Sequence, residues 1–171
     1  MVEGDTIGTR FASELGFESI SMLKCVERLP ADKMDWRPHD KSMTLSRLAG
    51  HLVEMLDWIP SITETDGINF ADYKYSPKNY QDGKEIASDL RVALEKADAA
   101  LRNVTDESMR GKWTMKAGDV TLSDTSRAIS MRSFIFNHLY HHRGQLSVYM
   151  RLLDIPVPSI YGPSADEGAS A

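Results

Sequence analysis

Residues 137–153 read NHLYHHRGQLSVYMRLL, and their apolar residues recur at the spacing of an amphipathic helix. At about 100° per residue, one narrow face of that helix gathers five apolar side chains from this stretch and the residues before it. They are Ile135, Leu139, Leu146, Met150 and Leu153. A seam of this kind is typical of a helix that packs into the core of a helical bundle. The pattern continues upstream and predicts a last helix over residues 126–153.

Three earlier stretches show the same periodicity and predict helices. They cover residues 6–29, 42–59 and 82–104. Pro60 is expected to end or kink the second of these helices, because proline lacks a backbone donor. Four amphipathic helices with little strand predict an all-α protein, a four-helix bundle. The chain has 171 residues, so we expect one domain over 1–171, with an irregular tail over 154–171.

The segments on either side of the third helix have a different character. Residues 66–81 carry three tyrosines without helical periodicity, and we expect an irregular connection there. Residues 111–124, GKWTMKAGDVTLSD, place a turn signal between short runs rich in Trp, Thr and Val. This pattern predicts a short hairpin before the last helix. Connections of this length do not force a simple up-and-down order of helices.

The composition restricts the classes of partner and compartment. The net charge is −5, the isoelectric point is about 5.5, and no run of lysine and arginine occurs. Nucleic-acid surfaces are normally basic, so we expect no nucleic-acid partner. Cys25 is the single cysteine, which excludes an intramolecular disulfide and fits a reducing compartment. The sequence has neither a signal-like N-terminus nor a membrane-spanning run, and we therefore expect a cytoplasmic protein without a membrane partner.

Two histidines of the quoted stretch are spaced to share an ion. His138 and His142 stand one helical turn apart on the same side, beside the apolar seam. His51 lies at the margin of the apolar stripe of the second helix, and helix packing can bring it to the pair. Three imidazoles that leave coordination positions open are typical of a catalytic metal site. A metal-free, hydrogen-bonded pair has the same spacing, and spacing alone does not join His51 to it. His39 and His141 are interpreted as ordinary polar residues.

Three segments of the chain resemble the DinB/YfiT-like superfamily of metal-dependent four-helix-bundle proteins. They are NHLYHHRGQL, with the superfamily's His-x-x-x-His and Arg-Gly-Gln, then DWRPHDKSMTLSRLAGHLVEM and KWTMKAGDVTLS. The resemblance implies that His51, His138 and His142 bind Ni(II) or Zn(II), with water completing the coordination shell. It also implies an up-down-down-up bundle and a homodimer. Some relatives are transferases or isomerases that use a low-molecular-weight thiol.

Two kinds of side chain near the histidines are candidates for proton transfer. Glu54 lies one turn beyond His51, but a solvated charge on the outer face is the simpler interpretation. Tyr149 lies on nearly the same side of the predicted helix as His138 and His142. Aromatic packing in the core is the simpler explanation of a tyrosine at this position.

Arg143 and Gln145 are candidates for binding a cofactor or substrate. They could anchor a carboxylate or orient a histidine. Arg143 projects toward the apolar seam, where an unpaired charge is unfavourable. We therefore expect it to meet a carboxylate or the tail, which offers Asp166 and Glu167.

Together with the resemblance, these features predict a metal-dependent enzyme acting on a small molecule, either a thiol-dependent transferase or a hydrolase. Leu139 stands where HExxH metallopeptidases need their glutamate, which excludes that class. Nucleophile-elbow, phosphate-loop and dinucleotide glycine patterns are also missing. The alternative is a non-catalytic protein in which the ion stabilises the bundle or is sensed. A metal-free helical bundle is the third interpretation.

Overall fold

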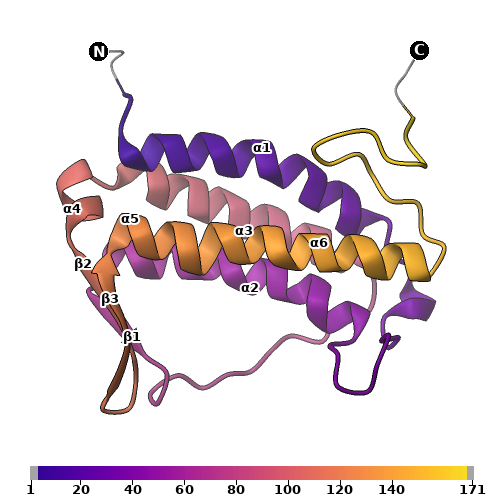
Figure 1. Ribbon diagram of the computed structural model, residues 1–171, viewed down its shortest axis with the longest axis horizontal. Coiled ribbons are helices and arrows are strands. Elements are labelled where there is room, and N and C mark those ends of the chain that lie inside the picture. Colours follow the sequence, from indigo (N-terminus) through magenta and orange to yellow (C-terminus); the bar gives the residue numbers. More distant parts are fainter. Residues whose placement is uncertain (1–3, 169–171) are drawn as a thin grey trace.

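The computed structural model describes residues 4–168, and helices make up most of them (Figure 1). The helices are α1 (Ile7–Glu27), η1 (Ala31–Lys33), α2 (Leu45–Glu64), α3 (Gly83–Asn103), α4 (Asp106–Arg110), α5 (Arg127–Ser130), η2 (Met131–Phe136) and α6 (Asn137–Leu152). The strands are β1 (Gly67–Asn69), β2 (Lys112–Ala117) and β3 (Val120–Ser126). The four predicted helical stretches are therefore helical. None of the helices described within residues 4–168 combines the length and the hydropathy of a membrane span.

Hydrogen-bonding side chains define where the long helices begin. Thr6 accepts a bond from the backbone N–H of Thr9 at 3.1 Å and caps α1. Thr44 caps α2 in the same way, and Asp82 accepts from the N–H of Glu85 at 2.9 Å to cap α3. Such residues satisfy backbone donors that have no partner within the helix.

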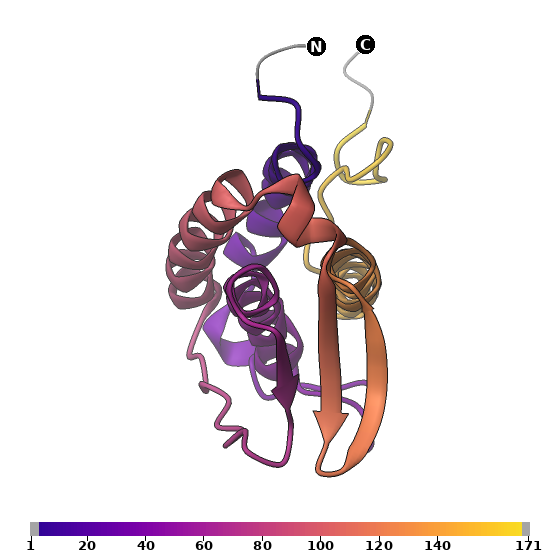
Figure 2. The same cartoon turned by 90° about the vertical axis from the view of Figure 1, so that its left-hand side faces the viewer.

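The long helices pack around a shared apolar core in which α2 takes the central place. α2 contacts both α3 and α6, while α1 covers α3 and α6 from the other side. The view along the helices in Figure 2 shows α2 between α3 and α6, with α1 above them. Leu48, Leu52 and Ile59 of α2 are fully buried, as are Leu139 and Leu146 of α6. The seam predicted for the last helix therefore faces the core.

The expectation of an all-α protein was wrong in one respect, because a three-stranded sheet lies at one end of the helices (Figures 1 and 2). β2 and β3 form the predicted hairpin, which turns at Gly118 with a φ of +61°. β1 pairs with β2 in parallel, with Gly67 opposite Thr114. The sequence did not predict β1, because three residues are too few to show alternation.

Two helices differ in detail from the expectation, and Pro60 does not end the second one. α2 continues past Pro60 to Glu64, so the proline lies inside the helix rather than at its end. The Thr63 hydroxyl donates to the carbonyl oxygen of Pro60 at 3.1 Å in this last turn. The last helix is interrupted by the π-helical segment η2 directly before Asn137. A single π segment leaves no periodicity from which it could be predicted.

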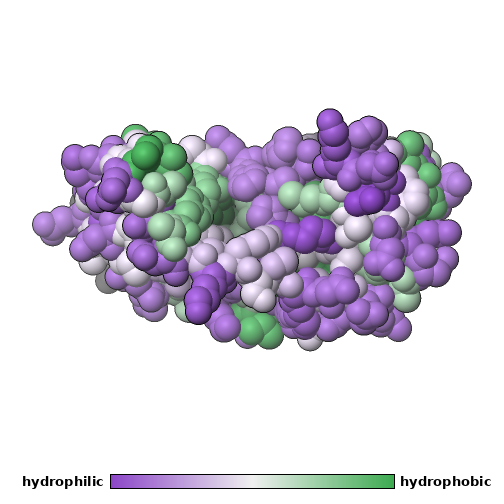
Figure 3. Space-filling model, turned by 90° about the horizontal axis from the view of Figure 1, so that it is seen from below, coloured by the Kyte–Doolittle hydropathy of each residue, from purple (hydrophilic) through white to green (hydrophobic). Residues whose placement is uncertain are grey.

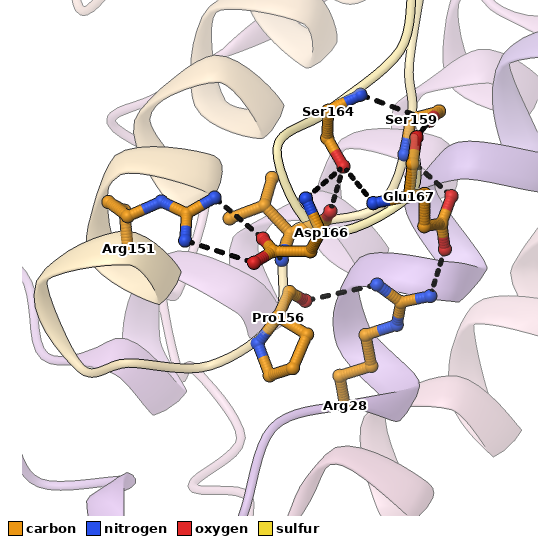
Figure 4. A network of polar contacts seen from close by, with 8 residues as sticks. Arg28, Arg151, Pro156, Ser159, Ser164, Asp166 and Glu167 are labelled. Carbon is orange, nitrogen blue, oxygen red and sulfur yellow. Dashed lines mark hydrogen bonds and ion pairs between the residues drawn. The ribbon is translucent and has the colours of Figure 1, made fainter. Parts of the chain in front are cut away.

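The irregular tail folds back over the helices, and it is described as far as residue 168. Figure 4 shows its polar contacts. Asp166 accepts hydrogen bonds from Arg151 of α6, at 2.6 Å for the shorter one. Glu167 pairs with Arg28 at the end of α1, and Arg28 also donates to the Pro156 carbonyl at 3.0 Å. The tail is thus bound to two helices that are distant in sequence.

The connection between α2 and α3 is fastened to α2 by Tyr80. The Ser46 hydroxyl donates to the Tyr80 carbonyl at 2.9 Å, and the Tyr80 ring lies over Gly50. A Cβ atom at Gly50 would lie 2.7 Å from this ring, so the close approach requires glycine. The Tyr80 hydroxyl donates to Asp89 of α3 at 3.1 Å. Tyr80 is therefore bound to α2 through its backbone carbonyl and to α3 through its hydroxyl.

Replacing Gly50 by alanine is expected to destabilise the protein. Overpacking a buried contact typically costs about 1–3 kcal/mol, which exceeds the roughly 1 kcal/mol that alanine adds to a helix. Urea denaturation of the variant should show a lower free energy of unfolding. Gly144→Ala is the matched control, because no described atom lies within 4 Å of its Cβ position, and it should stabilise α6 by up to about 1 kcal/mol. Equal stability of the two variants would contradict the tight packing of Tyr80.

Candidate metal centre

Three imidazoles from two helices converge between α2 and α6. His51 comes from α2, and His138 and His142 come from α6. One ring nitrogen of each lies within 4.8 Å of the others, and the ring centroids are 4.5–5.3 Å apart. Metal–nitrogen bonds to histidine are about 2.0–2.1 Å long, so small ring rotations would place all three nitrogens around one ion. The three histidines could therefore hold a metal ion.

The outer nitrogen of His51 is bound to a carboxylate. Its Nδ1 lies 2.8 Å from Oε2 of Glu54, one turn further along α2. The same oxygen accepts a hydrogen bond from Arg47 at 2.9 Å and one from the Tyr75 hydroxyl at 3.3 Å. A carboxylate in this position keeps the proton on Nδ1, so the Nε2 lone pair of His51 is available to a metal.

The outer nitrogen of His142 has an acceptor of its own. Nδ1 of His142 lies 2.7 Å from the amide oxygen of Gln145. Nε2 of His138 faces His142, so its Nδ1 is the outer nitrogen of that ring. The two Nε2 atoms lie 2.8 Å apart. At that distance one ring donates to the other, which is the metal-free hydrogen-bonded pair that the spacing also allowed. A small separation of the two rings would free both lone pairs for an ion.

Burial keeps the α6 pair neutral. Desolvation lowers the pKa of His142 to about 4, although its hydrogen bond to Gln145 acts in the opposite direction and the neighbouring histidines add to the lowering. Desolvation also lowers the pKa of His138, and the proximity of His51 contributes. Only a neutral imidazole has a lone pair to offer, so these shifts favour metal binding over protonation.

The sequence interpretation of Glu54 as a solvated charge missed its contact with His51. Their spacing of three residues on one helix was the available signal, because residues i and i+3 are neighbours on a helix. Gln145 was considered as a residue that orients a histidine, and the structure places its amide oxygen on His142. Tyr149 instead packs edge-on against Trp36, and its hydroxyl donates to the Met43 carbonyl at 3.3 Å.

Arg143 points away from the histidines, toward α1. Its guanidinium donates to the Glu18 carboxylate and, at 2.7 Å, to the Ser21 hydroxyl, and it also contacts the Tyr161 hydroxyl of the tail. Arg143 does meet a carboxylate and the tail, as expected. The expectation that the tail's acidic residues would be its partners was wrong, because Asp166 and Glu167 pair with Arg151 and Arg28.

The remaining two histidines stay outside the cluster. His39 lies in the exposed loop before α2, where its Nδ1 accepts from the backbone N–H of Lys41 at 3.1 Å. His141 is exposed on the outer side of α6, with its ring centroid 4.9 Å from that of His142.

Comparisons with known proteins confirm the resemblance noted in the sequence. The model of the DinB family matches residues 7–170. A Bacillus subtilis protein named as the uncharacterized protein YrdA is 28% identical over 166 residues, which is 93% of this chain and 90% of that protein.

Two solved structures have a similar fold. A DinB-like protein from Bacillus cereus superposes with a TM-score of 0.67 at 25% identity, over 88% of this chain and 95% of its own. A DinB-like protein from Bacillus subtilis superposes with a TM-score of 0.66 at 16% identity, over 92% of this chain and 98% of its own.

Removing the Glu54 carboxylate should weaken metal binding without removing any of the three histidines. Loss of a residue that orients a metal-binding histidine typically lowers affinity about 10–100-fold. We expect that loss for Glu54→Ala, measured for Zn(II) by competition with a chelating dye. Glu95→Ala, which removes an exposed carboxylate from α3, is the control and should leave the affinity unchanged. Wild-type affinity in Glu54→Ala would show that the His51–Glu54 contact does not matter to the ion.

Cys25 is excluded as a surface nucleophile. Its side chain is fully buried, and desolvation raises the pKa of its thiol to about 11. The reactive thiolate is therefore scarce near neutral pH. Ellman's reagent should leave the native protein unmodified at pH 8 and should titrate one thiol per chain in guanidinium chloride. Rapid reaction of the native protein would contradict this burial.

Proposed function

The chain belongs to the DinB family, and on this premise we propose that it is a metal-dependent enzyme acting on a small molecule. The supporting observation is the convergence of three imidazole nitrogens whose neighbours hold the rings in place. Glu54 and Gln145 contact Nδ1 of His51 and His142, and one ring nitrogen of each of His51, His138 and His142 lies within 4.8 Å of the others.

The donor set fits a divalent transition metal. Three neutral imidazole nitrogens suit Ni(II) and Zn(II), and no cysteine or carboxylate belongs to the cluster. A set of three protein ligands leaves coordination positions for water or substrate, as catalytic sites require. We propose Ni(II) or Zn(II) as the natural ion.

A divalent ion in this position supplies a Lewis acid that lowers the pKa of a bound water or thiol. The protein's own residues support that chemistry by fixing direction and charge. Glu54 holds the proton of His51 on Nδ1, and Arg47 balances the negative charge of Glu54. We propose a thiol-dependent transferase, with a low-molecular-weight thiol as co-substrate, or a hydrolase.

A second candidate is a non-catalytic protein stabilised by its ion. The observation in its favour is that the cluster joins α2 to α6, which are distant in sequence, so an ion would cross-link the fold. Removal of the ion by chelation separates the two functions. A stabilising ion would leave the protein largely unfolded on removal, whereas a catalytic ion would leave the helical content near its original value.

Four finer features accompany this proposal. We propose that the long helices follow the up-down-down-up order of a four-helix bundle, and that the chain forms one domain. The homodimer and the cytoplasmic location stay predictions as well, and we expect neither nucleic-acid nor membrane partners.

The test of the metal site is metal analysis of protein purified without a histidine tag. We expect about one first-row transition-metal ion per chain in the wild type and a loss of most of it in His142→Ala. His141→Ala is the matched control, since it removes the neighbouring imidazole from the outer side of the same helix, and it should retain the ion. Added Zn(II) should raise the Tm of the wild type and the control, because a ligand that binds only the folded state stabilises it. Equal metal content in His142→Ala, or none in the wild type, would refute the proposal.

A further inference from the structure

A cavity of about 490 Å³ opens directly beside the histidine cluster. His51 and His138 form part of its wall, so a molecule in the cavity would lie next to their ion. The volume is within the range of small-molecule sites, about 300–1,000 Å³. Figure 3 views the molecule from below and shows that this face is hollowed, with hydrophobic residues gathered beside the hollow.

Another part of the wall is aromatic. Trp58 of α2 is its centre, and its ring centroid lies 5.2 Å from that of Tyr73, 5.6 Å from Phe134 and 5.7 Å from Phe70. These rings come from α2, η2 and the connection that follows β1. Aromatic side chains that support one another at such distances form a rigid surface on which a planar ring can stack.

A single unpaired donor also lies at this cavity. Arg47 lines it and uses Nη2 for Glu54, whereas Nη1 is buried and has no hydrogen-bond partner among residues 4–168. A buried guanidinium N–H without an acceptor is unfavourable, and a small turn of the Arg47 side chain toward the cavity would let it donate to an acceptor atom on a bound molecule.

The neighbouring cavity has the opposite character. It measures about 410 Å³ and is lined by charged side chains, among them Asp57, Lys78, Asp89 and Lys96. Tyr73 and Tyr75 border both cavities and separate them. Of these two cavities, only the one lined by His51 and His138 contains the rings of Trp58, Phe70 and Phe134.

We propose that this cavity binds a small molecule with an aromatic ring at one end and a metal-binding head group at the other. The ring stacks against Trp58 and Phe134, the head group reaches the ion held by His51, His138 and His142, and an acceptor atom takes the free N–H of Arg47. This inference rests on the proposed function, since the ion anchors the head group.

The test compares two probes that share one metal-binding group. Benzohydroxamate and acetohydroxamate bind a metal through the same atoms but carry a phenyl ring and a methyl group, respectively. We expect benzohydroxamate to bind the Zn(II)-loaded protein at least tenfold more tightly, measured by isothermal titration calorimetry with metal content determined in parallel. A ratio near one in protein that retains its metal would overturn this inference and leave the proposed function intact. Protein that retains no metal would overturn the proposed function and this inference with it.

Substitutions in the aromatic wall test whether it causes the preference for benzohydroxamate over acetohydroxamate. Trp58→Ala should reduce the ratio of the two affinities at least threefold while metal content stays unchanged. Tyr73→Ala provides the same test at a half-exposed position, where loss of the ring leaves the core intact. Phe17→Ala removes an exposed ring from α1, outside the cavity, and should keep the wild-type ratio. A wild-type ratio in Trp58→Ala and Tyr73→Ala would refute the role of the wall.

Arg47→Met tests the contribution of Arg47, and Glu54→Ala is measured beside it because Arg47 also pairs with Glu54. We expect Arg47→Met to weaken both hydroxamates by a similar factor, three- to tenfold, without changing their ratio. Unchanged affinity for both probes at full metal content would remove Arg47 from the proposed binding site.

Discussion

The packing of α2 against α6 is the contact on which both the core and the candidate site depend. α2 contacts α3 on one side and α6 on the other, and its apolar face is fully buried between them. His51 lies at the margin of that face, and His138 and His142 lie at the facing margin of α6. The burial of apolar surface that assembles the core therefore also brings the three imidazoles together. A site built on packed helices is held more rigidly than one built on loops.

The orientation of α6 is determined by contacts on its other side. Arg143 is almost completely buried and pairs with Glu18 of α1, while Arg132 of η2 donates to Glu14 at 2.6 Å. A buried charge that loses its partner is strongly unfavourable, so rotation of α6 about its axis would be costly. These pairs toward α1 thus restrict the direction in which the histidines point toward α2. Arg143 therefore acts on the fold rather than on the candidate metal.

The connection between α2 and α3 is irregular in structure but not free in position. β1 fastens its beginning to β2, and Tyr80 fastens its end to Ser46 and over Gly50. Between these points the chain carries Tyr73 and Tyr75 to the mouth of the histidine cavity. The small sheet, which lies outside the helices, therefore helps to build the surface proposed to bind the substrate.

The sequence by itself determined the helical stretches and the candidate histidines, because both follow from the spacing of residues along a helix. It also determined the hairpin, because local turn residues predict it. His138 and His142 could be paired from their spacing, since both lie on one helix. His51 could be joined to them only through the family resemblance, because packing between helices is not encoded in local spacing. Glu54 and Gln145 lie three residues from His51 and His142 on the same helices, so their spacing offered a signal for these contacts. Tertiary structure alone decided that Arg143 turns to Glu18, and that Trp58, Tyr73 and Phe134 meet in one wall. Each of these contacts depends on the rotation of a packed helix or on the path of an anchored loop, which the core as a whole determines.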